Sequence, residues 1–172
     1  MDAAVAACAV QCVVEPEATG IGGDCFCLYA PKGTDQYIAY NGSGRAPKAA
    51  TAEWYAEQGI DKIEFTSAHA VTIPGSIDAW DRLIKDHGTM ALSEILKPAI
   101  EYAENGYAIT SRVAADFARN ENHLRSCENS KKVFLPNDRA IQEGEVHHQR
   151  ELAGTLRIIA DKGRDGFYEG EV

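Results

Sequence analysis

The chain has 172 residues, of which 45% are hydrophobic and 25% are charged, a composition typical of a globular protein with its own core. Its net charge of -9 disfavours nucleic acid as the main partner, because binding to phosphates requires a basic surface. No apolar run approaches the roughly 18 residues that span a bilayer, so we expect no membrane span. The start of the chain also lacks the basic segment of a signal peptide.

The first predicted element is a helix from Asp2 to Val14, which is rich in Ala and Val and carries almost no charge. A helix that is apolar nearly all round is typical of a protein interior, where it packs on several sides. We therefore expect further polypeptide, upstream of Met1, to cover it. Glu15-Pro16 ends the helix, because proline restricts the residue before it.

A glycine-rich loop, Gly20-Ile21-Gly22-Gly23, leads into a predicted hairpin. Cys25 to Tyr29 is predicted as a buried strand and Gln36 to Tyr40 as its partner, joined by the turn Lys32–Asp35. A second glycine-rich loop, Asn41–Pro47, follows. The remaining predicted elements are a short helix capped by Thr51, a strand from Ala70 to Ile73, and helices over 76–87, 93–105, 111–124 and 149–161.

The cysteines favour a reduced protein. An odd count, with most of the thiols near the start, is a poor disulfide framework, so we expect buried thiols and slightly favour a cytoplasmic location. A zinc site built from the first four is the alternative, but we expect no metal. The five are Cys8, Cys12, Cys25, Cys27 and Cys127.

Several short motifs, in order along nearly the whole chain, resemble the γ-glutamyltranspeptidase family. The resemblance begins with the alanine-rich helix, Val14-Glu15-Pro16 and the Gly20–Gly23 loop. It continues through Ala46-Pro47, Val71-Thr72-Ile73-Pro74-Gly75, Pro98-Ala99-Ile100 with Ala103-Glu104-Asn105-Gly106, Phe134-Leu135-Pro136 and Phe167-Tyr168-Glu169-Gly170.

The resemblance implies an α/β (α+β) fold, the αββα sandwich of an N-terminal nucleophile hydrolase, of which this chain would be part of the large subunit. Such an enzyme is made as a precursor that cuts itself, and the new N-terminal threonine of the small subunit attacks the γ-glutamyl amide of a glutathione-like substrate. No cofactor is implied. That threonine would lie beyond Val172, so we expect residues 1–172 to be one domain, incomplete at both ends, with no catalytic residue of its own.

The resemblance also points to a substrate-binding position. Four residues before the proline of its Ala-Pro motif, the family carries an arginine that binds the substrate's α-carboxylate through a guanidinium fork. Ser43 occupies this position here, and Arg45 stands two residues later. We take both as substrate-binding candidates. Either Arg45 reaches the same space from a flexible loop, or it pairs locally and the pocket is altered.

Three functions therefore stay open. The first is cleavage of γ-glutamyl amides, the second is an acylase with another acyl group, and the third is an inactive fragment that only binds a small subunit. Export is expected if a missing N-terminus carries a signal.

Other residues have simpler interpretations. Gly22-Gly23 could place N–H groups near an oxyanion, but tight packing is favoured. A Cys25 nucleophile working with His69 is an alternative site. We predict that Trp54 and Trp80 are packing residues, and that His147-His148 lie in a solvated loop. No role is assigned to Asp24.

Overall fold

The computed structural model describes residues 1–172, and the chain's contacts group into two compact units. Unit 1 comprises residues 1–20 and 84–172, and unit 2 comprises residues 21–83. The single domain expected over residues 1–172 stays a prediction.

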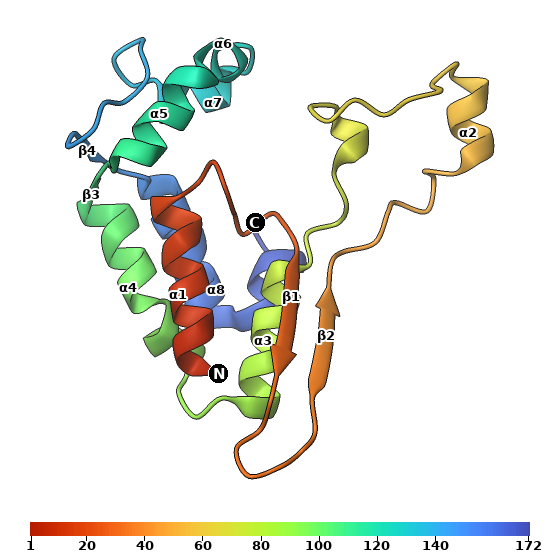
Figure 1. Cartoon of the computed structure of the whole chain (residues 1–172), viewed down its shortest axis with the longest axis vertical. Coiled ribbons are helices and arrows are strands. Elements are labelled where there is room, and N and C mark those ends of the chain that lie inside the picture. The colour runs from red at the N-terminus through yellow and green to blue at the C-terminus, as the bar shows by residue number, and fades with distance from the viewer. The chain divides into compact units, whose positions relative to one another are not determined.

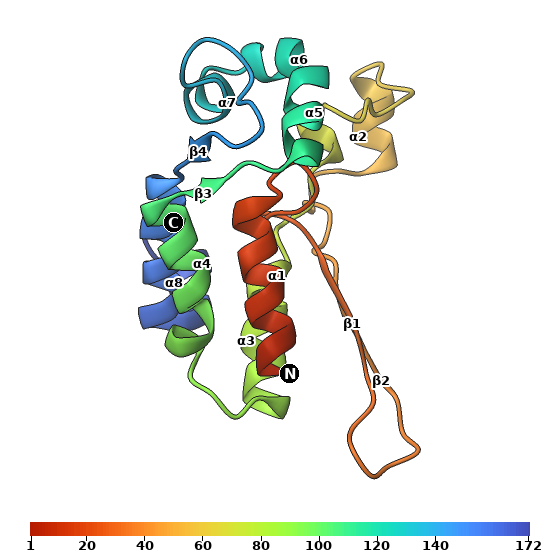
Figure 2. The same cartoon turned by 60° about the vertical axis from the view of Figure 1, so that its left-hand side comes forward.

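Unit 1 is built on three helices, with α4 packed against both α1 and α8 (Figures 1 and 2). Apolar residues three or four apart bury one face of α4, as the periodicity of an amphipathic helix requires. Two of these residues, Ala99 and Ala103, are small and fully buried, which lets the neighbouring helices approach closely. The bounds are α1 Asp2–Val14, α4 Leu92–Asn105 and α8 Arg150–Tyr168.

The predicted first helix is confirmed with the same bounds, and its two ends are tied down within unit 1. At the start, the Asp2 carboxylate accepts hydrogen bonds from the Thr89 hydroxyl (2.6 Å) and N–H (3.0 Å), which lower the pKa of Asp2. At the end, the buried side chain of Gln149 donates from Nε2 to the Val13 carbonyl (2.6 Å) and to the Tyr107 hydroxyl (3.0 Å). An otherwise unsatisfied carbonyl of the last helical turn is thereby paired.

Smaller elements lie beyond one end of these helices in both views (Figures 1 and 2). They are β3 Tyr107–Ala108, α5 Ser111–Arg119, α6 Glu121–Arg125, α7 Glu128–Phe134 and β4 Val146–His147. The strands β3 and β4 pair antiparallel, with Tyr107 opposite His147.

Three predictions for this region need correction. The single helix predicted over 111–124 is broken at Asn120, whose side chain donates to the Asp116 carbonyl (2.9 Å) and so competes with helix continuation. The helix α7 was not predicted. The last helix does not end at Asp161 but continues to Tyr168, past a kink at Gly163, which has φ 64° and ψ -148°.

Unit 2 contains an antiparallel hairpin of β1 (Cys25–Tyr29) and β2 (Ile38–Gly42), with Cys25 opposite Gly42. The predicted hairpin is confirmed, with its second strand two residues later than expected. The prediction that β1 is buried is wrong, because Phe26 and Leu28 point to a face on which they are 68% and 74% exposed.

The rest of unit 2 consists of short helical segments and loops. Thr51 caps α2 (Ala52–Glu57), as predicted, by accepting a hydrogen bond from the Trp54 N–H (3.2 Å). The predicted strand over residues 70–73 is wrong. Ala68–Ala70 form a 3-10 turn, and the Ile73 N–H makes a single backbone hydrogen bond, to the carbonyl of Arg45 just after β2. Helix α3 (Ser76–His87) is confirmed and begins in unit 2. None of the helices combines the length and apolar character needed to cross a bilayer.

Candidate functional site

Arg45 and Ser43 lie in the loop directly after β2. The Ser43 N–H donates to the Asn41 side-chain oxygen (3.0 Å), which forms a tight turn. Arg45 is exposed, and its guanidinium forms no ion pair or hydrogen bond within the chain. The local pairing considered from the sequence is therefore absent, and the guanidinium donors are available to an anion.

Although the side chain of Arg45 is exposed, its backbone is held. The Ile73 N–H donates to the Arg45 carbonyl (3.0 Å). A Cβ added to Gly44 would lie 1.5 Å from the Ile73 oxygen, and one added to Gly75 would lie 2.0 Å from the Gly42 oxygen. These glycines therefore serve the close approach of two backbone segments. The predicted flexible loop is instead fixed to residues 73–75.

A third segment joins these two at Gly23. The Gly23 carbonyl accepts hydrogen bonds from the N–H groups of Gly75 and Ser76 (both 3.1 Å) and from the Ser76 hydroxyl (2.7 Å). It thereby satisfies amides at the start of α3. The tight packing favoured for Gly22-Gly23 is not seen at Gly22, where an added Cβ would meet nothing within 4 Å. The Thr72 hydroxyl also donates to the Asp24 carboxylate (3.4 Å). We call these three segments, residues 23–24, 42–45 and 72–76, the loop cluster.

A small aromatic pocket of about 170 Å³ is lined by residues between Pro47 and Val71, the stretch of sequence that joins the second and third segments of the loop cluster. Three rings form its wall: Trp54 and Tyr55 have centroids 5.1 Å apart, and the ring of His69 lies 5.6 Å from each of them. Trp54 is 37% exposed, so it is not the simple packing residue expected, unlike the buried Trp80. The pocket is lined by Pro47, Ala49, Ala50, Trp54, Tyr55, Ala68, His69 and Val71.

The sequence carries one signal for this pocket. Two aromatic residues, Trp54 and Tyr55, sit on a short capped helix a few residues after Arg45. The contribution of His69 was not readable, because it reaches the same place from a separate turn. The alternative pairing of His69 with a Cys25 nucleophile stays a prediction.

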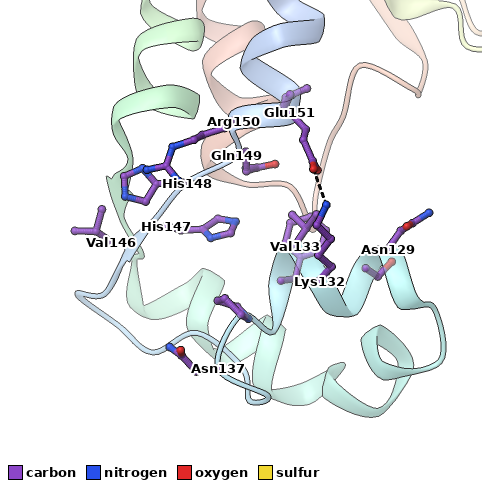
Figure 3. A pocket seen from close by; sticks show the side chains of 14 residues that line it. Asn129, Lys132, Val133, Asn137, Val146, His147, His148, Gln149, Arg150 and Glu151 are labelled. Atoms are coloured by element: carbon purple, nitrogen blue, oxygen red, sulfur yellow. Dashed lines mark hydrogen bonds and ion pairs between the residues drawn. The ribbon is translucent and has the colours of Figure 1, made fainter.

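A larger pocket, of about 790 Å³, lies in unit 1 between α7 and the start of α8 (Figure 3). Lys132 on α7 and Glu151 on α8 form an ion pair (2.6 Å), drawn as a dashed line in Figure 3. The lining residues are Asn129, Ser130, Lys132, Val133, Phe134, Pro136, Asn137, Val146, His147, His148, Gln149, Arg150, Glu151 and Leu152.

The prediction that His147 lies in a solvated loop is wrong, because it is only 4% exposed. Its ring packs against those of Tyr107 (5.8 Å) and Phe134 (6.0 Å), and its Nε2 has no hydrogen-bond partner. Burial, and to a lesser extent the neighbouring His148, lowers the pKa of His147 to about 4. The imidazole is therefore neutral at pH 7. His148 is half-buried, and its Nδ1 lies 3.1 Å from the Glu104 carbonyl.

The cysteines and acidic residues form no second centre. No two cysteines are joined by a disulfide, and no group of three or more His, Cys, Asp or Glu side chains is placed to hold a metal ion. Of the thiols expected to be buried, only Cys12 is; Cys25 and Cys27 are half-buried, and Cys8 and Cys127 are exposed. The larger pocket offers a neutral imidazole, one ion pair and the exposed guanidinium of Arg150. The loop cluster holds the two substrate-binding candidates named from the sequence, Ser43 and Arg45, and is therefore taken as the candidate site for a charged substrate.

Comparison with known proteins shows the family to which the chain belongs. All of residues 1–172 match the sequence profile of the family described as gamma-glutamyltranspeptidase. The chain is 37% identical over 171 residues to the glutathione hydrolase-like YwrD proenzyme of Bacillus subtilis, covering 99% of this chain and 32% of that protein. It is also 37% identical to the oxamate amidohydrolase proenzyme of Klebsiella pneumoniae, covering 99% and 33%. The chain thus spans about a third of these relatives.

Solved structures show the same fold. The Helicobacter pylori gamma-glutamyltranspeptidase superimposes with a TM-score of 0.91 at 33% identity, over 99% of this chain and 50% of that one. The cephalosporin acylase of Bacillus halodurans also gives 0.91, at 35% identity, over 98% and 32%. The predicted α/β fold, that of N-terminal nucleophile hydrolases, is therefore confirmed.

Proposed function

Because the chain belongs to the γ-glutamyltranspeptidase family, we propose that it is the substrate-binding part of an enzyme that cleaves γ-glutamyl amides. The γ-glutamyl group of a glutathione-like substrate is transferred to water or to an amine. The role of this chain is to hold the substrate's α-carboxylate, while the nucleophile comes from another part of the protein.

The observation that carries this proposal is the state of Arg45. Its guanidinium is exposed and unpaired, while its carbonyl is fixed by the Ile73 N–H at 3.0 Å. A planar guanidinium binds a carboxylate through two parallel hydrogen bonds, and a fixed backbone limits what must be ordered on binding. Ser43 lies in the turn just before Arg45 in this loop. We propose it as a second contact, whose hydroxyl binds the substrate's carboxylate.

The chemistry we propose needs a residue that this chain does not supply. An N-terminal threonine, its own α-amine acting as base, attacks the amide carbonyl and releases the amine. The γ-glutamyl ester so formed is then opened by water or by an acceptor amine, without metal or cofactor. Several relatives of the chain are proenzymes, which supports a nucleophile made by cleavage of a precursor. On its own, residues 1–172 should be inactive.

We further propose that a small subunit covers the outer face of β1. Phe26 and Leu28 lie next to each other on that face and are 68% and 74% exposed. Adjacent large apolar side chains left in water are typical of surfaces that bind another protein.

A specific observation favours a second candidate, an acylase with another acyl group. Ser43 stands where the resemblance implies an arginine, and relatives include an oxamate amidohydrolase and a cephalosporin acylase. Three anilides separate the two functions: the γ-glutamyl group carries an α-amino group and a carboxylate, the glutaryl group carries only the carboxylate, and the butanoyl group carries neither. A γ-glutamyl enzyme prefers the first, whereas an acylase that ignores the α-amino group hydrolyses glutaryl anilide at least as well.

The test of the proposed function is hydrolysis of γ-glutamyl-p-nitroanilide by the purified chain, alone and after co-expression with the small subunit of a relative. We expect no activity from the chain alone and activity from the combination. Activity of the chain alone would contradict the missing nucleophile and direct attention to Cys25 and His69. An inactive combination that still forms a complex would favour the third function, a fragment that only binds a partner.

A further inference from the structure

The aromatic pocket has the size and lining of a site for one flat, uncharged ring. Its volume is about 170 Å³, and a protein cavity of roughly 150 Å³ is known to hold one benzene molecule. No carboxylate, ammonium or guanidinium group is among its lining residues. Aromatic walls set at steep angles to one another, such as Trp54 and Tyr55 at 80°, offer both faces and edges to a bound ring.

The pocket is also adjacent to Arg45. Pro47, which lines the pocket, is two residues from Arg45, so their Cα atoms lie within about 7 Å of each other. Proline fixes φ at this junction, and the Arg45 carbonyl is bonded to Ile73. Val71, on the other wall, is likewise two residues from Ile73. The same two backbone segments therefore carry both the guanidinium and the pocket.

From this juxtaposition we propose that the substrate or acyl acceptor of this enzyme carries both a carboxylate and an aromatic six-membered ring. Arg45 binds the carboxylate, and the pocket formed by Trp54, Tyr55 and His69 binds the ring. This inference rests on the proposed function for the role of Arg45 and adds a ring-binding subsite that selects among carboxylate-bearing amides.

The experiment measures binding of three matched probes to the purified chain by calorimetry. 4-Phenylbutyrate carries both groups, butyrate carries only the carboxylate, and 4-phenylbutanamide carries only the ring. We expect 4-phenylbutyrate to bind at least about tenfold more tightly than either of the others, because one buried ring, absent from butyrate, and one charge-assisted carboxylate contact, absent from the amide, each contribute about that factor.

Variants assign each part of the affinity. Trp54→Ala should reduce the affinity for 4-phenylbutyrate to that for butyrate, and Arg45→Ala should reduce it to that for the amide. Trp54→Phe, which keeps a ring, should retain most of the affinity. Because the ring of Trp54 packs against Tyr55 and His69, the thermal midpoint of each variant is measured as well, and affinities are compared at a temperature at which every variant is folded.

Two results would overturn the inference, and they differ in what they leave standing. Equal, Arg45-dependent affinities for 4-phenylbutyrate and butyrate would remove the ring subsite but leave Arg45 as the carboxylate site of the proposed function. The pocket would then belong to a side chain of further polypeptide. Ring binding that depends on Trp54 but not on Arg45 would instead remove the carboxylate site, and the proposed function would lose its main support.

Discussion

Arg45 combines an exposed, unpaired guanidinium with a backbone that is bonded to a neighbouring segment. In the active enzyme, Arg45→Ala should raise KM for γ-glutamyl anilide roughly 10- to 100-fold, because hydrogen bonds to a charged group contribute about 1.5–3 kcal/mol. Arg45→Lys should recover part of this loss, since lysine keeps the charge but not the fork. Steady-state kinetics provide the measurement.

The matched control for Arg45 is Lys48→Ala, which removes an exposed positive charge three residues away. Its KM should stay unchanged. If both variants raise KM equally, the effect is a general one of local charge, and an unchanged KM in Arg45→Ala removes this residue from the site.

His147 carries a buried nitrogen with no hydrogen-bond partner, which is a cost that a nonpolar residue of similar size avoids. His147→Leu should therefore raise the free energy of unfolding by about 1 kcal/mol, or the thermal midpoint by about 2–4 °C. The control is His148→Leu, which gives up the contact of His148 with the Glu104 carbonyl and should give no gain. A loss of stability in His147→Leu equal to that of the control would mean that Nε2 has a partner in solution.

The same residue predicts a pH dependence. The pKa of His147 is lowered from 6.5 to about 4 in the folded chain, so between these values the unfolded chain binds more protons. Stability should therefore fall as pH decreases from about 6.5 towards 4. Thermal unfolding between pH 6.5 and 5, above the range in which carboxylates titrate, should show a smaller decline for His147→Leu than for the original chain. Identical slopes would contradict the lowered pKa.

At this scale, the sequence identified the residues whose roles depend on near neighbours. Thr51 as a cap and Arg45 as a candidate followed from the residues around them. The burial of His147 did not, because it depends on the pairing of β4 with β3, almost 40 positions earlier in the chain, and on the ring of Phe134. His147 and His148 are polar, so without knowledge of the β3–β4 pairing both are predicted to be solvated.

Among the structural elements, the loop cluster gives the clearest prediction of which glycine can be replaced and which cannot. A Cβ at Gly44 would lie 1.5 Å from the Ile73 oxygen, whereas one at Gly22 would meet nothing within 4 Å. Gly44→Ala should therefore lower the free energy of unfolding by about 1–3 kcal/mol, and Gly22→Ala should change it little. Urea unfolding of the two variants tests this difference. Equal stabilities would mean that the loop is mobile, as the sequence had suggested.

The long elements were predictable and the short ones were not. The helices α3 and α4 show clear apolar periodicity, α1 is a continuous apolar run ended by Glu15-Pro16, and the hairpin strands flank a turn, so the positions of these elements were predicted to within two residues. The break at Asn120, the helix α7 and the two-residue strands carry no such period, because they are fixed by single side-chain bonds and by tertiary contacts. The Arg45 loop was found from its motif, but its rigidity came only from the approach of residues 73–75.

For the molecule as a whole, the exposed face of β1 predicts how the chain associates. The double substitution of Phe26→Ser with Leu28→Ser should change the chain's own stability by no more than about 0.5 kcal/mol, because both side chains are in water. Its affinity for a small subunit should fall at least tenfold, since buried apolar anchors dominate such interfaces. Lys32→Ala, in the hairpin turn, is the control. Unchanged affinity, measured by surface plasmon resonance, would place the partner elsewhere.

The interleaving of the two units has a consequence during synthesis on the ribosome. Unit 2 is contiguous, so every residue of it has been made once Leu83 is added. Unit 1 begins with α1, whose last turn is bonded to Gln149 and whose neighbour α4 packs against α8. The face of α1 that packs against α4 therefore stays uncovered until α4 has been made, roughly 90 residues later, which takes about 5–18 s at typical elongation rates. During that interval α1 should be accessible to a chaperone, and once α4 has been made it should not be.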